Sequence, residues 1–182
     1  MAGRLVTGQP AGPSPAGAAP VILWWLRPLV RHTIGMASSP AQACVFCGII
    51  AGELTASRVY EDDDVVAFMD VRPLTPGHVL VVPRAHAASL EDLDEDLGTR
   101  VFAVAHQLAR ALRSSAVPCE GVNFFLADGV AAGQEVFHVH LHVIPRTPGD
   151  GFRLKARART PGRDDLDATA ERVREGMSSP PR

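Results

Sequence analysis

Several residue types are scarce in this chain, and each shortage excludes a class of protein. Three cysteines in 182 residues are too few for a disulfide scaffold and are typical of a reducing compartment. Lysine occurs once, and the net charge of −2 argues against a surface that binds nucleic acid. No uninterrupted apolar run reaches the ~20 residues that span a bilayer. The composition therefore predicts a cytoplasmic protein with one domain that binds neither nucleic acid nor membranes.

The first forty residues differ from the rest, because they contain no acidic residue and are rich in proline and glycine. Their apolar run is interrupted by Arg27 and Pro28, and a signal peptide would need its basic residue, Arg4, closer to that run. Met36 begins a segment, M-A-S-S-P-A-Q-A-C-V-F-C, with which a small cytoplasmic protein could start. We therefore expect residues 1–40 to be disordered, or the first 35 to be untranslated.

The remaining chain divides into a domain over 41–178 and a frayed tail over 179–182. Apolar residues recur at helical spacing from about Asp94 to Ser114, and Asp164–Met177 is a second amphipathic segment. Arg58–Glu61 and Val65–Met69 read as strands joined by a turn of three aspartates. In such a turn, aspartates are more often solvated than bound to a metal.

Histidines recur at every second position between Gly133 and Arg146, in the stretch G-Q-E-V-F-H-V-H-L-H-V-I-P-R. In a β-strand alternate side chains share a face, so His138, His140 and His142 would form a row with spacings of roughly 7 Å. A helix would bring only the first and third together, and the β-branched valines also favour a strand. The stretch therefore predicts a strand that presents three imidazoles on one face and aliphatic side chains on the other.

Such a row suits two kinds of site. Imidazole is a common zinc ligand, and a neutral imidazole is also a nucleophile. The preceding loop over 127–134, A-D-G-V-A-A-G-Q, is built from small residues, and backbone N–H groups in such a loop can surround an anion. Loop and row together indicate a phosphate held against an imidazole nucleophile.

The motif H-V-H-L-H-V-I, preceded by A-G-Q-E-V-F and followed by P-R, resembles that of the histidine triad (HIT) family. The likeness includes C-V-F-C at 44–47, A-F-M-D at 67–70 and P-G-H-V-L-V-V-P at 76–83, and it covers about residues 43–152. It implies an α+β HIT-like fold: an antiparallel five-stranded sheet, a crossing helix and a C-terminal helix. It also implies a homodimer formed by joining two sheets.

Members of this family are nucleotide hydrolases and transferases that act at an α-phosphate. The resemblance implies that the chain cleaves a purine nucleoside phosphoramidate or a dinucleoside polyphosphate and releases a nucleoside monophosphate. His140 would attack the phosphorus to form a nucleotidyl-histidine, His142 would hydrogen-bond the phosphoryl oxygens, and His138 would orient the site. The chemical step would need no metal.

The resemblance also implies a substrate-binding set. Asp70 would bind the ribose hydroxyls, and His78 would give a supporting hydrogen bond near the triad. The set is completed by residues of the loop and of the strand before it: Asn123, Gly133, Gln134, Glu135 and Val136.

A structural zinc site is the remaining implication. The pair Cys44 and Cys47 forms one C-x-x-C, and no second such motif is present, so further ligands must be histidines. Some bacterial members of the family that begin C-x-F-C, which this chain resembles, hold zinc with two cysteines, the histidine of P-x-x-H and the first triad histidine. Here those last two positions are His86 and His138, which gives a Cys₂His₂ set.

Two positions depart from the family's better-known members. Ala127 stands where hydrolases carry Asn or Gln, and Glu135 stands where many carry Ser or Thr. The leaving group is therefore left open, and a nucleotide-binding interaction module with little turnover is an alternative. Nucleotidyl transfer to an acceptor other than water is a second alternative, although such transferases carry H-x-H-x-Q and His142 favours hydrolysis.

Overall fold

The computed structural model describes residues 4–5, 44–153 and 156–178. Arg4–Leu5 forms a short strand, β1, which pairs with β2 (Arg58–Glu61). The other residues of the predicted N-terminal extension and of the predicted frayed tail lie outside the described residues, so both expectations stay predictions.

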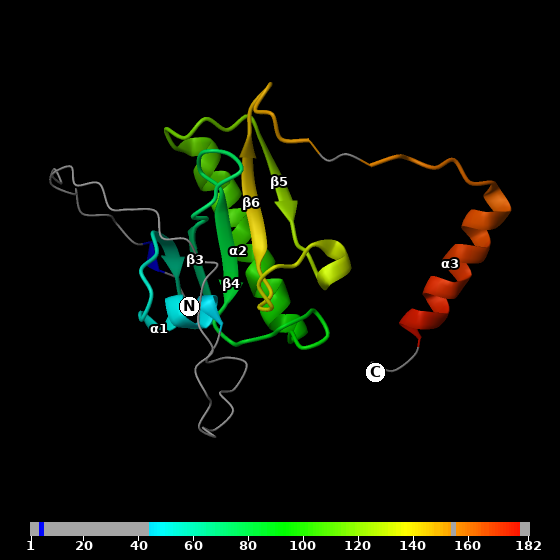
Figure 1. The fold of residues 1–182 in the computed structure, drawn as a ribbon, viewed down its shortest axis with the longest axis horizontal. Coiled ribbons are helices and arrows are strands. Elements are labelled where there is room, and N and C mark those ends of the chain that lie inside the picture. The colour runs from blue at the N-terminus through cyan, green and yellow to red at the C-terminus, as the bar shows by residue number, and fades with distance from the viewer. Residues whose placement is uncertain (1–3, 6–43, 154–155, 179–182) are drawn as a thin grey trace, which may run out of the picture.

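The predicted five-stranded antiparallel sheet is confirmed, and β1 adds a two-residue sixth strand at its edge. The five strands are β2 (Arg58–Glu61), β3 (Val65–Met69), β4 (Val79–Pro83), β5 (Gly121–Phe125) and β6 (Leu141–Arg146). They lie in the order β2-β3-β4-β6-β5 (Figure 1). Strands β3 and β4 are almost wholly buried and apolar, because both faces of the sheet are covered at its centre.

The long helix α2 (Glu95–Ser114) crosses one face of the sheet, as the sequence predicts (Figure 1). It starts at Asp94, whose carboxylate accepts a hydrogen bond from the N–H of Leu97 and so caps the helix. Its buried face packs on alternate strand residues such as Ala67, Val81 and Val143. This packing forms the larger apolar core.

A shorter helix, α1 (Val45–Ala51), covers part of the opposite face. Phe46 and Ile49 of α1 pack on Phe68, Leu80 and the strand residues beside them to form a second core. The helix ends at Gly52, whose φ of 81° lies in the left-handed region that favours glycine. The functional residues gather on this side of the sheet.

The histidine row differs from the prediction in one respect, because only His142 belongs to a regular strand. The last pair of the ladder between β4 and β6 is Val81 with Leu141, and two positions further along the same register Pro83 would lie opposite Val139. Proline has no N–H to donate, so the ladder ends there. The N–H of Val139 instead donates to the carbonyl of Ala87. His138, at the end of a bend, and His140 therefore precede β6.

The predicted turn of three aspartates joins β2 and β3, but Asp62 is not simply solvated. Its carboxylate accepts hydrogen bonds from Tyr60, from the N–H groups of Asp64 and Val65, and from Arg100 of α2. Asp62 therefore ties the hairpin to the crossing helix.

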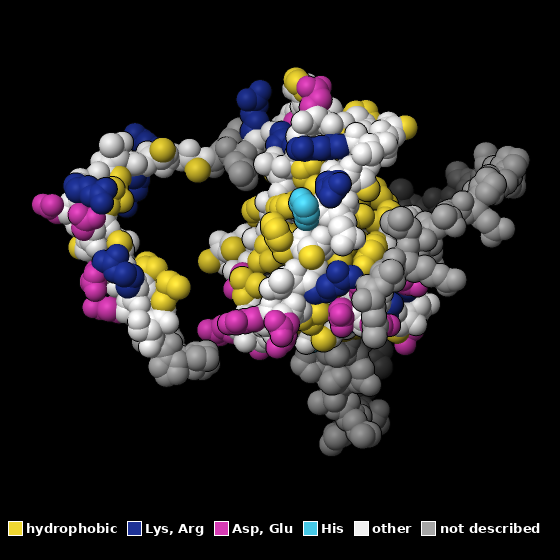
Figure 2. Space-filling view, turned by 180° about the vertical axis from the view of Figure 1, so that it is seen from behind, with side chains coloured by type: hydrophobic (Ala, Val, Ile, Leu, Met, Phe, Trp, Pro, Cys, Tyr) yellow, Lys and Arg dark blue, Asp and Glu magenta, His cyan; other side chains and the backbone are white. Residues whose placement is uncertain are grey.

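The C-terminal helix α3 (Arg163–Met177) contains no buried residue and lies apart from the sheet in Figure 1. No helix among the described residues is both long enough and apolar enough to cross a membrane. Seen from the α2 side, basic side chains lie scattered between hydrophobic patches, with acidic ones toward the lower end (Figure 2). Positive charge is not concentrated on this face.

Candidate active site and metal centre

A cavity of about 800 Å³ opens on the α1 side of the sheet, beside the histidine row. Its apolar wall includes Phe46 and Ile49 of α1 and Phe68 of β3, and its polar wall includes His140 and His142. This volume lies in the range that binds a small organic ligand. An apolar wall facing a row of imidazoles suits a ligand with one flat apolar part and one anionic part.

His140 lies at the inner wall of the cavity and is only 7% exposed. Its Nδ1 is 2.8 Å from the carbonyl oxygen of His138, which can only accept, so Nδ1 carries the proton. The other ring nitrogen, Nε2, then holds a lone pair. Phe46 packs edge-on against the ring, with centroids 5.1 Å apart, and restricts its orientation.

The protonation of His142 follows from a chain of hydrogen bonds that begins in the backbone. The N–H of Leu74 donates to Nδ1 of His78 at 3.2 Å, so the proton of His78 lies on Nε2. That nitrogen is 2.9 Å from Nδ1 of His142, which must accept. The proton of His142 therefore lies on Nε2, and the two neighbouring triad imidazoles are opposite tautomers, one with a lone pair and one with a donor.

Burial favours the neutral form of these imidazoles. It lowers the pKa of His78 and of His140. Burial, together with the nearby rings of His140 and His78, lowers the pKa of His142 to about 4. The tautomers described above are therefore the states expected near neutral pH.

Asp70 follows β3 and lines the cavity next to the imidazoles. Its Oδ1 accepts the N–H of Arg72 at 2.8 Å, which orients the carboxylate. Its Oδ2 lies 3.5 Å from Nδ1 of His78, a nitrogen that already accepts from Leu74. Asp70 therefore keeps acceptor capacity for a ligand.

The loop before the row contains a short 3-10 helix, η2 (Val130–Ala132), followed by Gly133 at a φ of 86°. Gln134 is buried, and its amide bonds the N–H of Gly129 and the carbonyls of Ala88 and Val136, so its side chain holds the loop in shape. The N–H groups of Gly133 and Gln134 donate within the loop. Among the described residues, those of Glu135 and Val136 have no protein acceptor.

The substrate-binding candidates fall into three groups. Asp70, His78, Gly133, Glu135 and Val136 line the cavity with His140 and His142. Gln134 is buried within the loop and does not line the cavity. Asn123 is an exposed residue of β5 whose Oδ1 accepts from Arg146, and it does not line the cavity.

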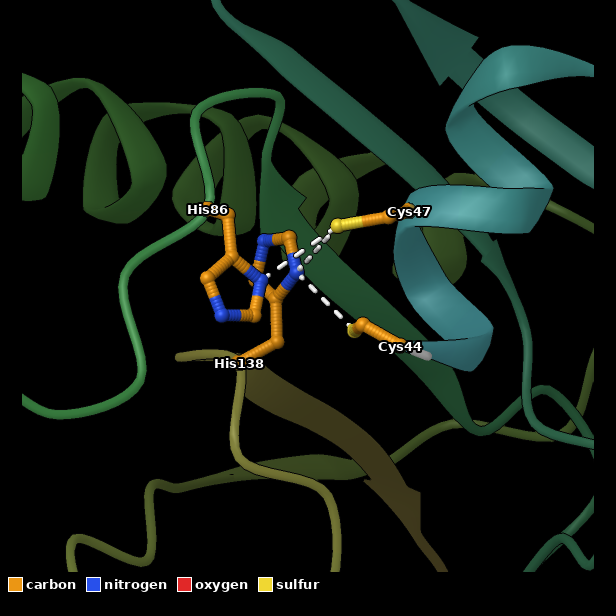
Figure 3. A group of neighbouring side chains, drawn as sticks. All are labelled: Cys44, Cys47, His86 and His138. Carbon is orange, nitrogen blue, oxygen red and sulfur yellow. Dashed lines mark hydrogen bonds between the residues drawn. The ribbon is translucent and has the colours of Figure 1, made fainter. Parts of the chain in front are cut away.

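The four predicted metal ligands lie together, and Figure 3 shows both thiols pointing at two imidazoles. The cysteines come from the start of α1, His86 from the loop after β4, and His138 from the segment before β6. Cys44 and Cys47 Sγ lie 3.5 and 3.6 Å from Nδ1 of His138, and Cys47 Sγ lies 3.3 Å from Nδ1 of His86. Zn–S and Zn–N bonds at tetrahedral angles give an S···N separation of about 3.6 Å. The cluster fits zinc.

One further observation supports a cation in this cluster. Nε2 of His138 is 2.9 Å from the carbonyl of Pro83, so its proton lies there and Nδ1 presents a lone pair to the thiols. Burial and the neighbouring Cys44 raise the pKa of Cys47 to about 11. A cation between the two sulfurs would reverse this cost, because thiolates are the form that binds metal.

Some groups of the site carry no sequence signal. The carbonyls of Pro83 and His138 and the N–H of Leu74 fix three tautomers, and backbone groups are present in every sequence. Arg72 was also not foreseen, although a basic residue two positions after Asp70 is visible in the sequence. Its ion pair with Glu135, 63 residues away, depends on the fold.

Comparison with known proteins agrees with this arrangement. The HIT domain profile matches residues 51–149. The chain belongs to the HIT family. A HIT-like protein of Borreliella burgdorferi is 49% identical over 113 residues, which cover 62% of this chain and 81% of that protein. The Hit protein of Bacillus subtilis is 42% identical over 113 residues, covering 62% and 77% of the two chains.

Solved HIT structures share the fold. A zinc-bound histidine triad family protein from Mycobacterium smegmatis has a TM-score of 0.61 at 38% identity, covering 75% of this chain and 99% of that one. A histidine triad nucleotide-binding protein from Candida albicans has a TM-score of 0.68 at 30% identity, with 75% and 98% covered. A HIT family hydrolase from Legionella pneumophila has a TM-score of 0.51 at 35% identity, with 59% and 99% covered.

Proposed function

We propose that this protein is a nucleotide hydrolase that cleaves at the α-phosphate of a purine nucleoside phosphoramidate or dinucleoside polyphosphate. The observation that carries this proposal is the pair of opposite tautomers at His140 and His142. One ring offers a nucleophile and its neighbour, with centroids 4.8 Å away, offers a proton. Phosphoryl transfer through a covalent histidine needs this combination.

The nucleotide would lie with its base against Phe46, Ile49 and Phe68 and its ribose hydroxyls on Asp70. The α-phosphate would then sit between His140 and the loop. The free N–H groups of Glu135 and Val136 would stabilise the charge that develops on its oxygens. His138 would act through its carbonyl, which holds the His140 ring.

In the first step, Nε2 of His140 forms a bond to phosphorus, and the bond from phosphorus to the leaving nitrogen or oxygen breaks. The leaving atom keeps the electron pair. A leaving amine takes one proton from solvent, relayed through Nε2 of His142 so that the ring ends neutral, and a leaving polyphosphate departs as an anion. In the second step water attacks phosphorus, loses a proton to solvent through His142 and frees His140. The products are a nucleoside monophosphate and the leaving group.

Zinc would be held by Cys44, Cys47, His86 and His138, where it would supply structural cross-linking of α1 to the segment before β6. The chain would also pair with a second copy through β5, which is at the edge of the sheet among the described residues. Light scattering coupled to size-exclusion chromatography would test the dimer by its mass.

The activity is tested by incubating the purified protein with adenosine phosphoramidate and with diadenosine tetraphosphate, and measuring AMP by chromatography. We expect release by the native protein and by His106→Ala, a matched variant on the exposed side of α2, and no detectable release by His140→Ala. AMP binding by the native protein without release from either compound would reject hydrolysis. It would favour the nucleotide-binding module, which the apolar Ala127 in the cavity wall would suit.

A further inference from the structure

The mouth of the cavity is bridged by an ion pair between Arg72 and Glu135. Arg72 belongs to the loop after β3 and Glu135 to the loop before the histidine row, and both line the cavity. Nη2 of Arg72 lies 2.8 Å from Oε2 of Glu135, and the two side chains are 80% and 75% exposed. An ion pair this exposed contributes little to folding stability, so a ligand can exchange one partner for itself at low cost.

The leaving group must pass the mouth of the cavity, where Arg72 and Glu135 lie. In a displacement at phosphorus, the attacking and leaving atoms are roughly in line on opposite sides. The attacking Nε2 belongs to His140 at the buried inner wall, so the leaving group departs toward the open side. Glu135 and Arg72 are the exposed charged side chains of the described cavity wall, and they would meet it there.

The formal charge of the cavity wall is negative. It contains two carboxylates, Asp70 and Glu135, against one guanidinium, Arg72. The imidazoles of His78 and His142 add no positive charge, because Nδ1 of each ring accepts a hydrogen bond and is therefore unprotonated. A leaving group rich in phosphates would bring more negative charge to this wall, whereas an amine with a second, cationic group would compensate it.

We propose that Glu135 selects phosphoramidates whose leaving amine carries a further positive charge. Until such a substrate enters, Arg72 forms an ion pair with Glu135. The proposal rests on the proposed function and names its substrate class. When the cation pairs with Glu135, the guanidinium of Arg72 is released to the substrate phosphate. The chemical step is unchanged: the phosphorus–nitrogen bond breaks, the amine leaves with the electron pair and takes one solvent proton relayed through His142, and its ammonium group stays intact.

The test uses two adenosine phosphoramidates of equal size, an aminopropyl and a hydroxypropyl compound, which differ by one positive charge. Diadenosine tetraphosphate supplies an anionic leaving group. AMP release by the native protein gives kcat/KM for each compound, and the ratio of aminopropyl to hydroxypropyl measures selection for the cation. We expect a ratio of about 2 to 5, as for one exposed charge pair, that falls as salt is added.

Two variants test the roles of Glu135 and Arg72 separately. Glu135→Gln is expected to bring the ratio close to one. Arg72→Gln is expected to raise it, because Glu135 then lacks its competitor. The matched control is Asp63→Asn, which removes one exposed negative charge in the β2–β3 turn, at the end of β3 remote from Asp70. Its ratio should equal that of the native protein.

A native ratio near one, or a ratio that Glu135→Gln leaves unchanged, would overturn the proposal while AMP release continued. Faster cleavage of diadenosine tetraphosphate than of the aminopropyl compound would also overturn it. Absence of AMP release from all three compounds would instead reject the proposed hydrolase. The two failures are therefore distinguishable.

Discussion

Two neighbouring histidines, His138 and His140, are two residues apart and share one face of the fold, yet their surroundings prepare them for different chemistry. His138 donates from Nε2 to the carbonyl of Pro83 and turns Nδ1 toward two thiols. His140 donates from Nδ1 to the carbonyl of His138 and keeps Nε2 for the cavity. The acceptor that each ring finds in the backbone decides which nitrogen is free, and therefore what the imidazole can do.

The metal cluster and the cavity are also physically joined. Phe46 lies between the two cysteines in sequence, and its ring contacts His138 and His140 and lines the cavity. A metal in the cluster would therefore fix both the apolar wall and the carbonyl that holds His140. Substitutions in the metal cluster are expected to reduce zinc binding and stability, whereas substitutions in the cavity are expected to reduce catalysis alone.

The largest effect is expected at the metal cluster. Cys47→Ser should abolish stoichiometric zinc binding and lower the free energy of unfolding by about 3 kcal/mol or more, because metal binding contributes directly to folding. Metal analysis and urea unfolding would measure both. His140→Ala should retain zinc, so zinc loss in both variants would remove the distinction between the two regions.

A smaller effect is expected at His78, which acts on the cavity alone. His78→Leu removes the donor to His142 and should lower kcat about 10- to 100-fold, the usual range for a residue that orients a functional imidazole. His78→Gln, whose amide can donate from a similar position, should recover part of the loss. Equal kcat values in the two variants, with zinc retained, would show that this hydrogen bond does not set the tautomer of His142.

The smallest effect is expected at Asp62, which belongs to neither region. Although burial opposes its ionisation, hydrogen bonds from Arg100, Tyr60 and two backbone N–H groups lower the pKa of Asp62 from 3.8 to about 2. The folded state therefore favours the carboxylate, and this adds up to about 2 kcal/mol of stability at neutral pH. The contribution is complete above about pH 4 and is lost as the pH falls toward about pH 2.

Asp62→Asn should therefore be less stable than the native protein at neutral pH, and the difference should narrow below about pH 4. Urea unfolding of both proteins across this range would measure it. Subtracting the two curves removes the effect of the buried histidines, which both proteins share. A difference that does not change with pH would contradict the pKa of Asp62.

The fold and the grouping of the metal ligands could be predicted: periodic patterns indicated single elements, and the resemblance to the HIT family implied the whole sheet and the set of four ligands. The row of three histidines, the C-x-x-C pair and the apolar spacing of α2 are visible in the sequence. The end of the ladder at Pro83 was not foreseen, because the register that sets Pro83 opposite Val139 depends on how β4 and β6 pair. The tautomers and the pair between Arg72 and Glu135 depend on contacts between distant segments, so the sequence alone did not supply them.

The central claim is that His140 is the nucleophile, and rapid quenching during turnover tests it most directly. Native protein would be mixed with an adenosine phosphoramidate, quenched in alkali, digested and mapped by mass spectrometry. We predict a peptide that carries one added AMP at His140 and that is absent from His140→Ala. An adduct at His138 or His142, or rapid turnover with no adduct at any histidine, would contradict the account.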